Sequence, residues 1–368
     1  MIKRLYVDNY KCLSNFECTF DHINLILGLN GSGKSAIFEV LRNLQDVVTG
    51  TSPISIFKST TLTRWQKRDV QTFELEIEGN GGVYQYRLEV RHEAGTGERR
   101  IQLESVTYDG NPVYRAGLGR IHLFGDDHSE GPVMTGSWTQ SGIPFLEHSS
   151  SKLVWLRWWF RECLMCLQID PLNVQPMAEA ADPTLGANAG NFVAWYRHRI
   201  LPDMSAIVGL RESLRELYED FSGLNLTGEE VQHLFLSLGV SEERGKPKFI
   251  QLGFRELSEG ERALIILYTL LEVLRRDPDM TLCLDEPDNF LALAEIQPWL
   301  LNLKDAVEAN RSQSLLISHH PELINYLAPS CGLLFEREKN GPVRVKHFEA
   351  ETGDGTLTPS EMVARGWE

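Results

Sequence analysis

Residues 23–35 read Ile-Asn-Leu-Ile-Leu-Gly-Leu-Asn-Gly-Ser-Gly-Lys-Ser. The apolar run from Ile23 to Leu27 predicts a buried strand, and the apolar spacing over 36–45 predicts a helix after the loop. The loop fits G-x-x-x-x-G-K-[ST] at every fixed position. Its glycines let the backbone wrap around an anion, and its N–H groups and the helix start point at that anion. We therefore expect a phosphate-binding loop formed by Gly28, Asn30, Gly31, Ser32, Gly33, Lys34 and Ser35.

A second apolar strand, at 282–284, ends in two carboxylates, Asp285 and Glu286. A strand beside a phosphate loop has to supply an acid near Mg²⁺, so we expect Asp285 to hold the metal together with the Ser35 hydroxyl. Glu286 is then placed to polarise the water that attacks the γ-phosphorus. Lys34 is expected to reach the β- and γ-phosphates.

Two further motifs extend this pattern. Residues 257–261 read Leu-Ser-Glu-Gly-Glu before a long predicted helix, so Ser258 and Gly260 form either a second phosphate-binding end or an ordinary helix cap. If the two phosphate-binding ends cannot meet within one chain, we expect them to meet across a dimer with ATP between them. A strand at 315–317 leads to His319, which is expected to hydrogen-bond the γ-phosphate and hold the attacking water.

These four motifs, in this order, resemble the Walker A, signature, Walker B and switch-histidine motifs of the ATP-binding-cassette (ABC) superfamily. More narrowly, the chain resembles the SMC, RecF and OLD branch, as an OLD-like ATPase with an AAA-type core and no nuclease domain. The stretches that carry the narrower resemblance are 9–13, 190–193, 257–262, 284–287 and 317–323.

The rhythm of apolar residues predicts three regions. Alternation over 70–123 predicts an antiparallel sheet, helical signals over 171–245 predict a compact helical insertion, and strand–helix alternation after Lys248 predicts a mostly parallel sheet. The resemblance implies an α/β fold: an ABC-type ATPase head with an antiparallel β lobe, a parallel-sheet core and a helical lobe. The expected boundaries are an N-terminal lobe at 1–170, a helical lobe at 171–250 and a C-terminal lobe at 251–368.

The resemblance also implies roles for individual residues. ATP and Mg²⁺ are the implied ligands. Ser258 and Gly260 would contact ATP held by the other subunit of a homodimer, and Lys11 would approach the nucleotide from the first hairpin. The Q-loop glutamine of the family has two candidates, Gln175 and, as the alternative, Gln168. The implied catalytic residues are Lys34, Glu286 and His319, and the implied metal ligands are Ser35 and Asp285.

Composition excludes several classes of protein. The longest apolar stretch, 263–271, is far shorter than the roughly 20 residues of a membrane-spanning helix, and the N-terminus lacks a secretory signal. We therefore expect a cytoplasmic protein without a membrane partner. The formal net charge of −15 argues against coating of nucleic acid, and the small basic clusters at 64–68 and 91–100 are expected to be solvated faces.

The biological role has two candidates at this point. The resemblance implies an ATPase that dimerises around ATP and controls a separate effector, such as a nuclease, in a bacterial defence system. The alternative is a RecF- or SMC-like DNA-repair clamp, which needs a basic groove on the sheet lobe and leaves DNA as a further candidate ligand. Three tryptophans on a predicted helix at 152–166 are expected in the core, and an exposed one would mark a partner surface.

Overall fold

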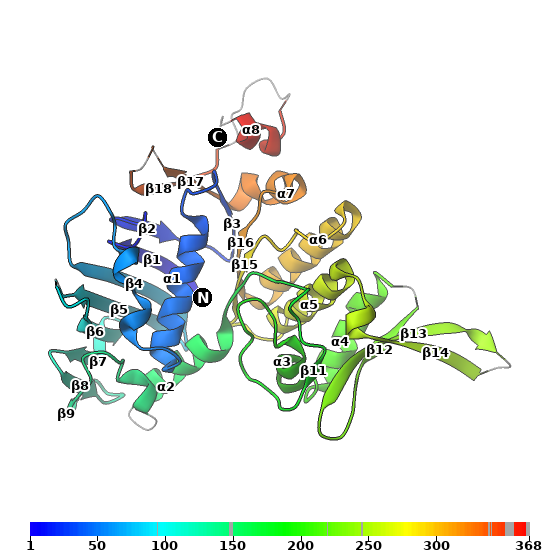
Figure 1. The fold of residues 1–368 in the computed structure, drawn as a ribbon, viewed down its shortest axis with the longest axis horizontal. Helices are drawn as coiled ribbons and strands as arrows, with labels where there is room; N and C mark the ends of the chain where they lie inside the picture. The colour runs from blue at the N-terminus through cyan, green and yellow to red at the C-terminus, as the bar shows by residue number, and fades with distance from the viewer. Residues whose placement is uncertain are drawn as a thin grey trace.

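The computed structural model describes residues 1–93, 95–146, 150–218, 220–243, 246–337, 339, 341–349 and 357–365. Its strands form an eight-stranded sheet, a six-stranded sheet and a four-stranded sheet. Figure 1 shows the eight-stranded sheet at one side, the six-stranded sheet in the middle and the four-stranded sheet at the other side.

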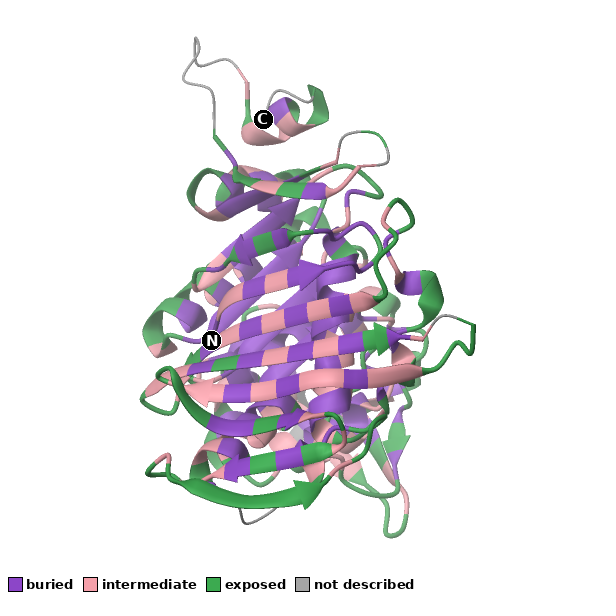
Figure 2. Cartoon of the chain, turned by 90° about the vertical axis from the view of Figure 1, so that its left-hand side faces the viewer, coloured by how far each residue is buried: buried purple, intermediate pink, exposed green. Residues whose placement is uncertain are grey.

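The eight-stranded sheet is antiparallel throughout, as the alternation over 70–123 predicts. Apolar side chains of alternate residues face the core, and the polar residues between them face outward, which gives the stripes of Figure 2. The last strand of this sheet, at 130–135, is an exposed edge strand that pairs with one neighbour. In spatial order the strands are β2 (Phe16–Thr19), β1 (Ile2–Asp8), β4 (Val70–Gly79), β5 (Gly82–His92), β6 (Arg99–Tyr108), β7 (Asn111–Gly117), β8 (Arg120–Phe124) and β9 (Glu130–Thr135).

The six-stranded central sheet is parallel except for its last strand. One face packs on helix α1 (Lys34–Thr49) and the eight-stranded sheet, and the other face packs on three helices. These are α5 (Glu259–Leu274), α6 (Leu293–Asn310) and α7 (Pro321–Cys331), and α8 (Pro359–Arg365) packs on α7. The strand order is β10 (Leu164–Leu167), β15 (Thr281–Asp285), β16 (Gln313–Ile317), β3 (Ile23–Leu27), β17 (Gly332–Arg337) and β18 (Val343–His347).

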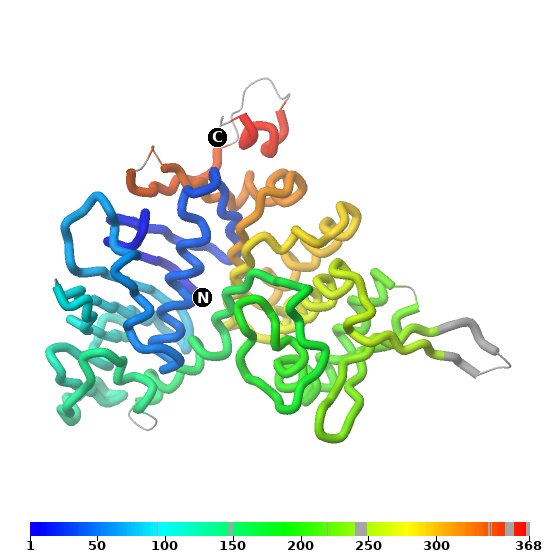
Figure 3. The backbone as a smooth tube through the Cα atoms, in the orientation of Figure 1, coloured from blue at the N-terminus to red at the C-terminus, as the bar shows by residue number. Residues whose placement is uncertain are grey.

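The part of the chain between β10 and α5 is only partly helical. Helices α3 (Phe192–Arg199) and α4 (Met204–Arg215) are present, but the expectation of a mostly helical insertion is wrong between Phe221 and Gly253. Leu234, Leu236 and Leu238 recur there at a period of two and lie in a strand. The hairpin of β13 and β14 extends away from the rest of the chain (Figure 3). The strands are β11 (Met177–Ala178), β12 (Phe221–Thr227), β13 (Gln232–Glu243) and β14 (Lys246–Gly253).

The tryptophan-rich segment is shorter as a helix than predicted. Helix α2 (Ser151–Trp158) runs into a π-helical turn, Trp159–Cys163, and the chain then enters β10. Trp159 is fully buried, and the Trp155 ring stacks on Tyr84 with 4.9 Å between the ring centroids. Both tryptophans therefore contribute to the core, as expected. None of the described helices combines the length and the apolar character needed to cross a bilayer.

A buried glutamate gives the sheet lobe a dependence of stability on pH. Glu104 of β6 is fully buried and accepts hydrogen bonds from the hydroxyls of Tyr86, Tyr114 and Ser141 at 3.0, 2.9 and 2.7 Å. Burial raises the pKa of Glu104 above its ordinary value of 4.5, although the hydrogen bonds oppose the shift.

Because the folded state binds this proton more tightly than the unfolded state, Glu104 costs stability as pH rises from its ordinary pKa through its folded pKa. We expect Glu104→Gln to remove this loss. The melting temperature of the variant relative to the native chain should therefore increase as the pH rises above 4.5 in thermal unfolding experiments. A difference that stays constant with pH would contradict the assignment.

Candidate functional site

The loop at 28–33 joins β3 to α1. At two of its positions the backbone conformation and the surrounding space admit only glycine. A Cβ on Gly28, whose φ is +139°, would lie 2.4 Å from the Phe335 carbonyl oxygen. A Cβ on Gly33, whose φ is +101°, would lie 2.8 Å from Cys12 Sγ. Gly33 caps α1 without a side-chain hydrogen bond, so the first N–H groups of the helix stay open to a ligand. Asn30 and Gly31 are exposed, whereas the Ser32 hydroxyl is buried and has no hydrogen-bond partner among the described residues.

Lys34, the first residue of α1, folds back over this loop. Its Nζ donates to the carbonyl oxygens of Gly28 and Leu29 at 2.6 and 3.2 Å. Burial lowers the pKa of Lys34, while the carboxylates of Asp285 and Glu286 oppose the shift. The ammonium group therefore lies inside the loop, on weak carbonyl partners that an anionic phosphate can replace.

The two carboxylates follow β15, a strand that lies one strand away from β3. Asp285 is buried, and burial raises its pKa, although a hydrogen bond from the Ser35 hydroxyl opposes the shift. Glu286 has a left-handed backbone with φ of +51°, and its N–H donates to the Ile317 carbonyl oxygen at 2.8 Å. A non-glycine residue in that region is strained, and such strain is common at functional sites. The Glu286 carboxylate accepts a hydrogen bond from Asn289 at 2.9 Å.

The two histidines after β16 take different positions. The His319 side chain is exposed overall. Partial burial of its ring and the charge of Lys34 lower its pKa, and the carboxylates of Asp285 and Glu286 oppose this shift. His319 therefore lies within electrostatic reach of the phosphate loop and of both acids. His320 instead caps α7, where its Nδ1 accepts from the Glu322 N–H at 3.1 Å.

The signature segment lies at the start of α5. Ser258 is exposed and forms a capping box with Glu261, in which the Ser258 N–H donates to the Glu261 carboxylate at 2.7 Å. A Cβ on Gly260 would lie 2.9 Å from the Phe290 carbonyl oxygen, so this helix start packs on the loop that follows Glu286. Among the described residues, no hydrogen bond or ion pair joins Ser258 to the phosphate loop.

Lys11 lines a cavity of about 720 Å³ beside the phosphate loop. Its ammonium group pairs with Glu39 and lies 5.7 Å from the centroid of the Tyr10 ring. The sequence reasoning missed two other residues of this cavity, Trp65 and Arg337. The Arg337 guanidinium lies 5.6 Å from the centroid of the Trp65 ring and donates to the Gly31 carbonyl oxygen at 3.3 Å.

The two candidate Q-loop glutamines lie at different places. Gln168 follows β10 directly, and because Leu167 pairs with Leu284, Gln168 continues in line with Asp285 at the same edge of the sheet. Gln175 is seven residues further on, and its N–H donates to the Gly190 carbonyl oxygen at 2.8 Å. Both side chains are exposed. The parallel register of β10 against β15 places Gln168 in line with Asp285, and the sequence alone does not reveal that register.

Comparisons with known proteins identify the fold. Residues 4–125 match the model of a family described as an AAA domain. A solved SMC head bound to the C-terminal winged-helix domain of ScpA is 15% identical, with a TM-score of 0.56, and the match covers 95% of this chain and 98% of that one. The chain has the fold of an SMC head.

An SMC head derived from Pyrococcus furiosus, solved with an extended coiled coil and the C-terminal domain of ScpA, gives the same result. It is 13% identical, with a TM-score of 0.55, and the match covers 95% of this chain and 96% of that one. No curated protein sequence matches the chain. The SMC head fold confirms the expected α/β class, with its antiparallel β lobe and parallel-sheet core.

Proposed function

We propose that this SMC-like head binds and hydrolyses ATP. The observation that carries the proposal is the convergence of three segments at one edge of the central sheet. The phosphate loop follows β3, the two acids follow β15, His319 follows β16, and their charges act on one another. Ligands of α/β sheets bind at this carboxyl edge of the strands.

The residues at this edge suit Mg²⁺ and the triphosphate. The hydroxyl of Ser35 lies close enough to the carboxylate of Asp285 to oppose the rise in its pKa, and both groups supply oxygen ligands of the kind that Mg²⁺ prefers. When bound, the metal neutralises charge on the phosphate oxygens. Lys34 then takes phosphate oxygens in place of the loop carbonyls, Glu286 accepts a proton from the attacking water, and His319 holds the γ-phosphate.

The cavity beside the loop suits the nucleotide base. Trp65 is 42% exposed and offers an aromatic face, and Arg337 joins that face to the backbone of Gly31. Aromatic rings bind nucleobases by stacking, worth roughly 1–3 kcal/mol per base. Lys11 lines the same cavity, where its ammonium group is paired with Glu39.

Two identical heads would complete each other's sites. Ser258 has its capping box and its helix start exposed to solvent, and it has no partner in the phosphate loop of its own chain among the described residues. Leu29 in the loop and Leu293 at the start of α6 are 78% and 60% exposed. Exposed apolar side chains beside a polar site are typical of a surface that a partner covers. We therefore assign ATP to the interface of a homodimer.

Removal of the loop cation is the direct test of nucleotide binding. In Lys34→Ala the charge that faces the β- and γ-phosphates is lost, so we expect ATP with Mg²⁺ no longer to raise the melting temperature and turnover to fall to background. Arg211→Gln, a charge change on the exposed face of α4, is the matched control. Equal stabilisation of both variants by ATP would sink the proposal.

The choice between the two glutamines follows from the register of β10. We expect Gln168→Ala to lower turnover by about tenfold or more, because a side chain in line with Asp285 can orient the metal and the attacking water. Gln175→Ala should keep turnover within about twofold, because nothing aligns its side chain with the acids. Steady-state ATPase assays of the two variants decide the assignment, and the opposite ranking would restore Gln175.

We propose control of a separate effector protein, such as a nuclease in a bacterial defence system, as the biological role in the cytoplasm. Three of the six basic residues in the two clusters of the sheet lobe, Arg68, Arg91 and Arg100, have an acidic partner among the described residues. Arg68 pairs with Asp8 at 2.5 Å, and Arg100 pairs with Glu93 and Glu98 at 3.3 and 3.2 Å. Compensated arginines release few counterions from DNA, which favours the effector over the DNA-repair clamp.

A further inference from the structure

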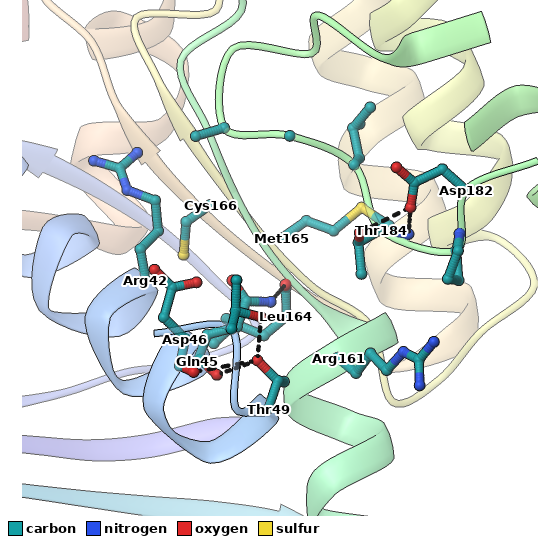
Figure 4. Close-up of a pocket in the computed structure, with 15 residues that line it drawn as sticks. Arg42, Gln45, Asp46, Thr49, Arg161, Leu164, Met165, Cys166, Asp182 and Thr184 are labelled. Carbon is teal, nitrogen blue, oxygen red and sulfur yellow. Dashed lines mark hydrogen bonds between the residues drawn. The ribbon is translucent and has the colours of Figure 1, made fainter. Parts of the chain in front are cut away.

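A cavity of about 600 Å³ lies between the sheet lobe and the segment that follows β10 (Figure 4). Its walls are α1, the π-helical turn before β10, β10 itself and the loop at 182–187. It shares no lining residue with the cavity beside the phosphate loop. This inter-lobe cavity has the volume of a small-molecule site.

The edge of β10 that faces away from β15 has one residue, Cys166, whose backbone groups lack hydrogen-bond partners among the described residues. The cavity lies beside this residue. The Leu164 carbonyl accepts from Gln45 Nε2 at 2.7 Å, and the Gln168 N–H donates to the Ala187 carbonyl oxygen at 2.8 Å. Residues two apart on a strand point the same way, so the N–H and C=O of Cys166 also point away from β15. Among the described residues, neither group has a partner on that side. The cavity therefore offers a backbone donor and a backbone acceptor side by side.

The charges at the two ends of the cavity differ. Figure 4 places Arg42 at one end and Arg161 at the other, with Met165 and Cys166 between them. The Arg42 charge acts on Asp46, one helical turn away, whereas Arg161 is exposed and lies within 4.0 Å of no described carboxylate. Asp182, on the opposite wall, accepts from the N–H and hydroxyl of Thr184, both at 2.9 Å. The uncompensated positive charge therefore lies at the Arg161 end.

We propose that the inter-lobe cavity is a second nucleotide site that binds a purine nucleoside monophosphate such as AMP. Adenine presents a ring-nitrogen acceptor beside an amino donor, which matches the N–H and C=O of Cys166. Met165 and Leu185 supply apolar contact for the ring. The phosphate pairs with Arg161, because guanidinium groups bind phosphate with two parallel hydrogen bonds.

Occupancy of this cavity acts on the candidate ATP site, a consequence that rests on the proposed function. Helix α1 forms one wall and begins with Lys34 and Ser35. The loop at 182–187 forms the opposite wall, and its last residue accepts the hydrogen bond from Gln168. A ligand that touches both walls fixes the position of Gln168 relative to the phosphate loop.

The test measures binding without turnover, in a chain whose phosphate loop is disabled. AMP, adenosine and ribose 5-phosphate are titrated into the Lys34→Ala variant by calorimetry. We expect AMP to bind at least about tenfold more tightly than adenosine, because only AMP carries the phosphate. Adding Arg161→Gln should remove that difference and leave adenosine unchanged. Adding Arg211→Gln, a change on the exposed face of α4, should preserve the difference in affinity between AMP and adenosine.

A filling variant guards against an indirect effect of charge. Thr49 lines the cavity from the last turn of α1, so Thr49→Trp occupies the space and leaves both arginines in place. We expect it to abolish AMP binding with a melting temperature close to that of the parent. Absence of AMP binding to Lys34→Ala, or binding that survives Thr49→Trp, would overturn the second site. ATP hydrolysis by the otherwise native chain is a separate measurement, so failure here leaves the proposed function standing.

Discussion

Glu286→Gln should reduce ATP turnover by about 10²- to 10⁴-fold, the contribution of a positioned general base. Glutamine keeps the size of the side chain and has a carbonyl oxygen that can accept the hydrogen bond from Asn289. The hydrogen bond that supports the strained backbone at this position is therefore kept. Binding of ATP should persist, because Lys34, Ser35 and Asp285 are unchanged. The variant should therefore accumulate as a dimer when ATP and Mg²⁺ are present. Light scattering with and without ATP measures this, and unaltered turnover would remove Glu286 as the base.

The control for this variant is Glu322→Gln. Glu322 is a half-buried acid in the first turn of α7, and its carboxylate accepts a hydrogen bond from Gln297 rather than from any residue of the site. We expect normal turnover from it. The trapped Glu286→Gln dimer also serves as bait in a native purification. Recovery of a second protein of defined stoichiometry supports the effector role, whereas a clean homodimer stimulated by duplex DNA ends favours the clamp.

Local patterns in the sequence predicted the strands, the loop and the helix that carry the candidate site. The phosphate loop needs a strand, a glycine-rich turn and a helix in immediate succession, and all three lie within 23–45. Asp285 and Glu286 likewise come at the end of a single apolar strand. In each case the chemistry depends on neighbours along the chain, so spacing alone locates the residues.

Residues that depend on strand order could not be located in this way. Trp65 and Arg337 meet only because β17 pairs with β3 and lies over the phosphate loop. Gln168 gains its place from the register of β10 against β15, two strands that are distant in the chain. The sheet at 221–253 was missed because its leucines alternate within polar surroundings that also suit a helix. Tertiary pairing decides each of these features.

Mixing two inactive chains should restore activity if the site is shared between subunits. Lys34→Ala removes the loop cation, and Ser258→Arg places a bulky cation at the exposed start of α5. Each variant alone should lose ATP-dependent dimerisation and turnover. In a mixed dimer, one site pairs the intact Lys34 of one chain with the intact Ser258 of the other. Since neither variant pairs with itself, every dimer in an equimolar mixture is mixed and holds one intact site of two, so the mixture should recover up to about half of native turnover.

Recovery also controls for misfolding, because loss of the Ser258 cap costs roughly 0.5–2 kcal/mol of stability. A chain that complements another must be folded. Ser151→Arg is the matched control, since Ser151 is an exposed serine at the first position of α2, and this variant should be active alone. A mixture no more active than its separate components would mean that each subunit hydrolyses ATP by itself. In that case the exposed start of α5 is a helix cap, and the interface lies elsewhere.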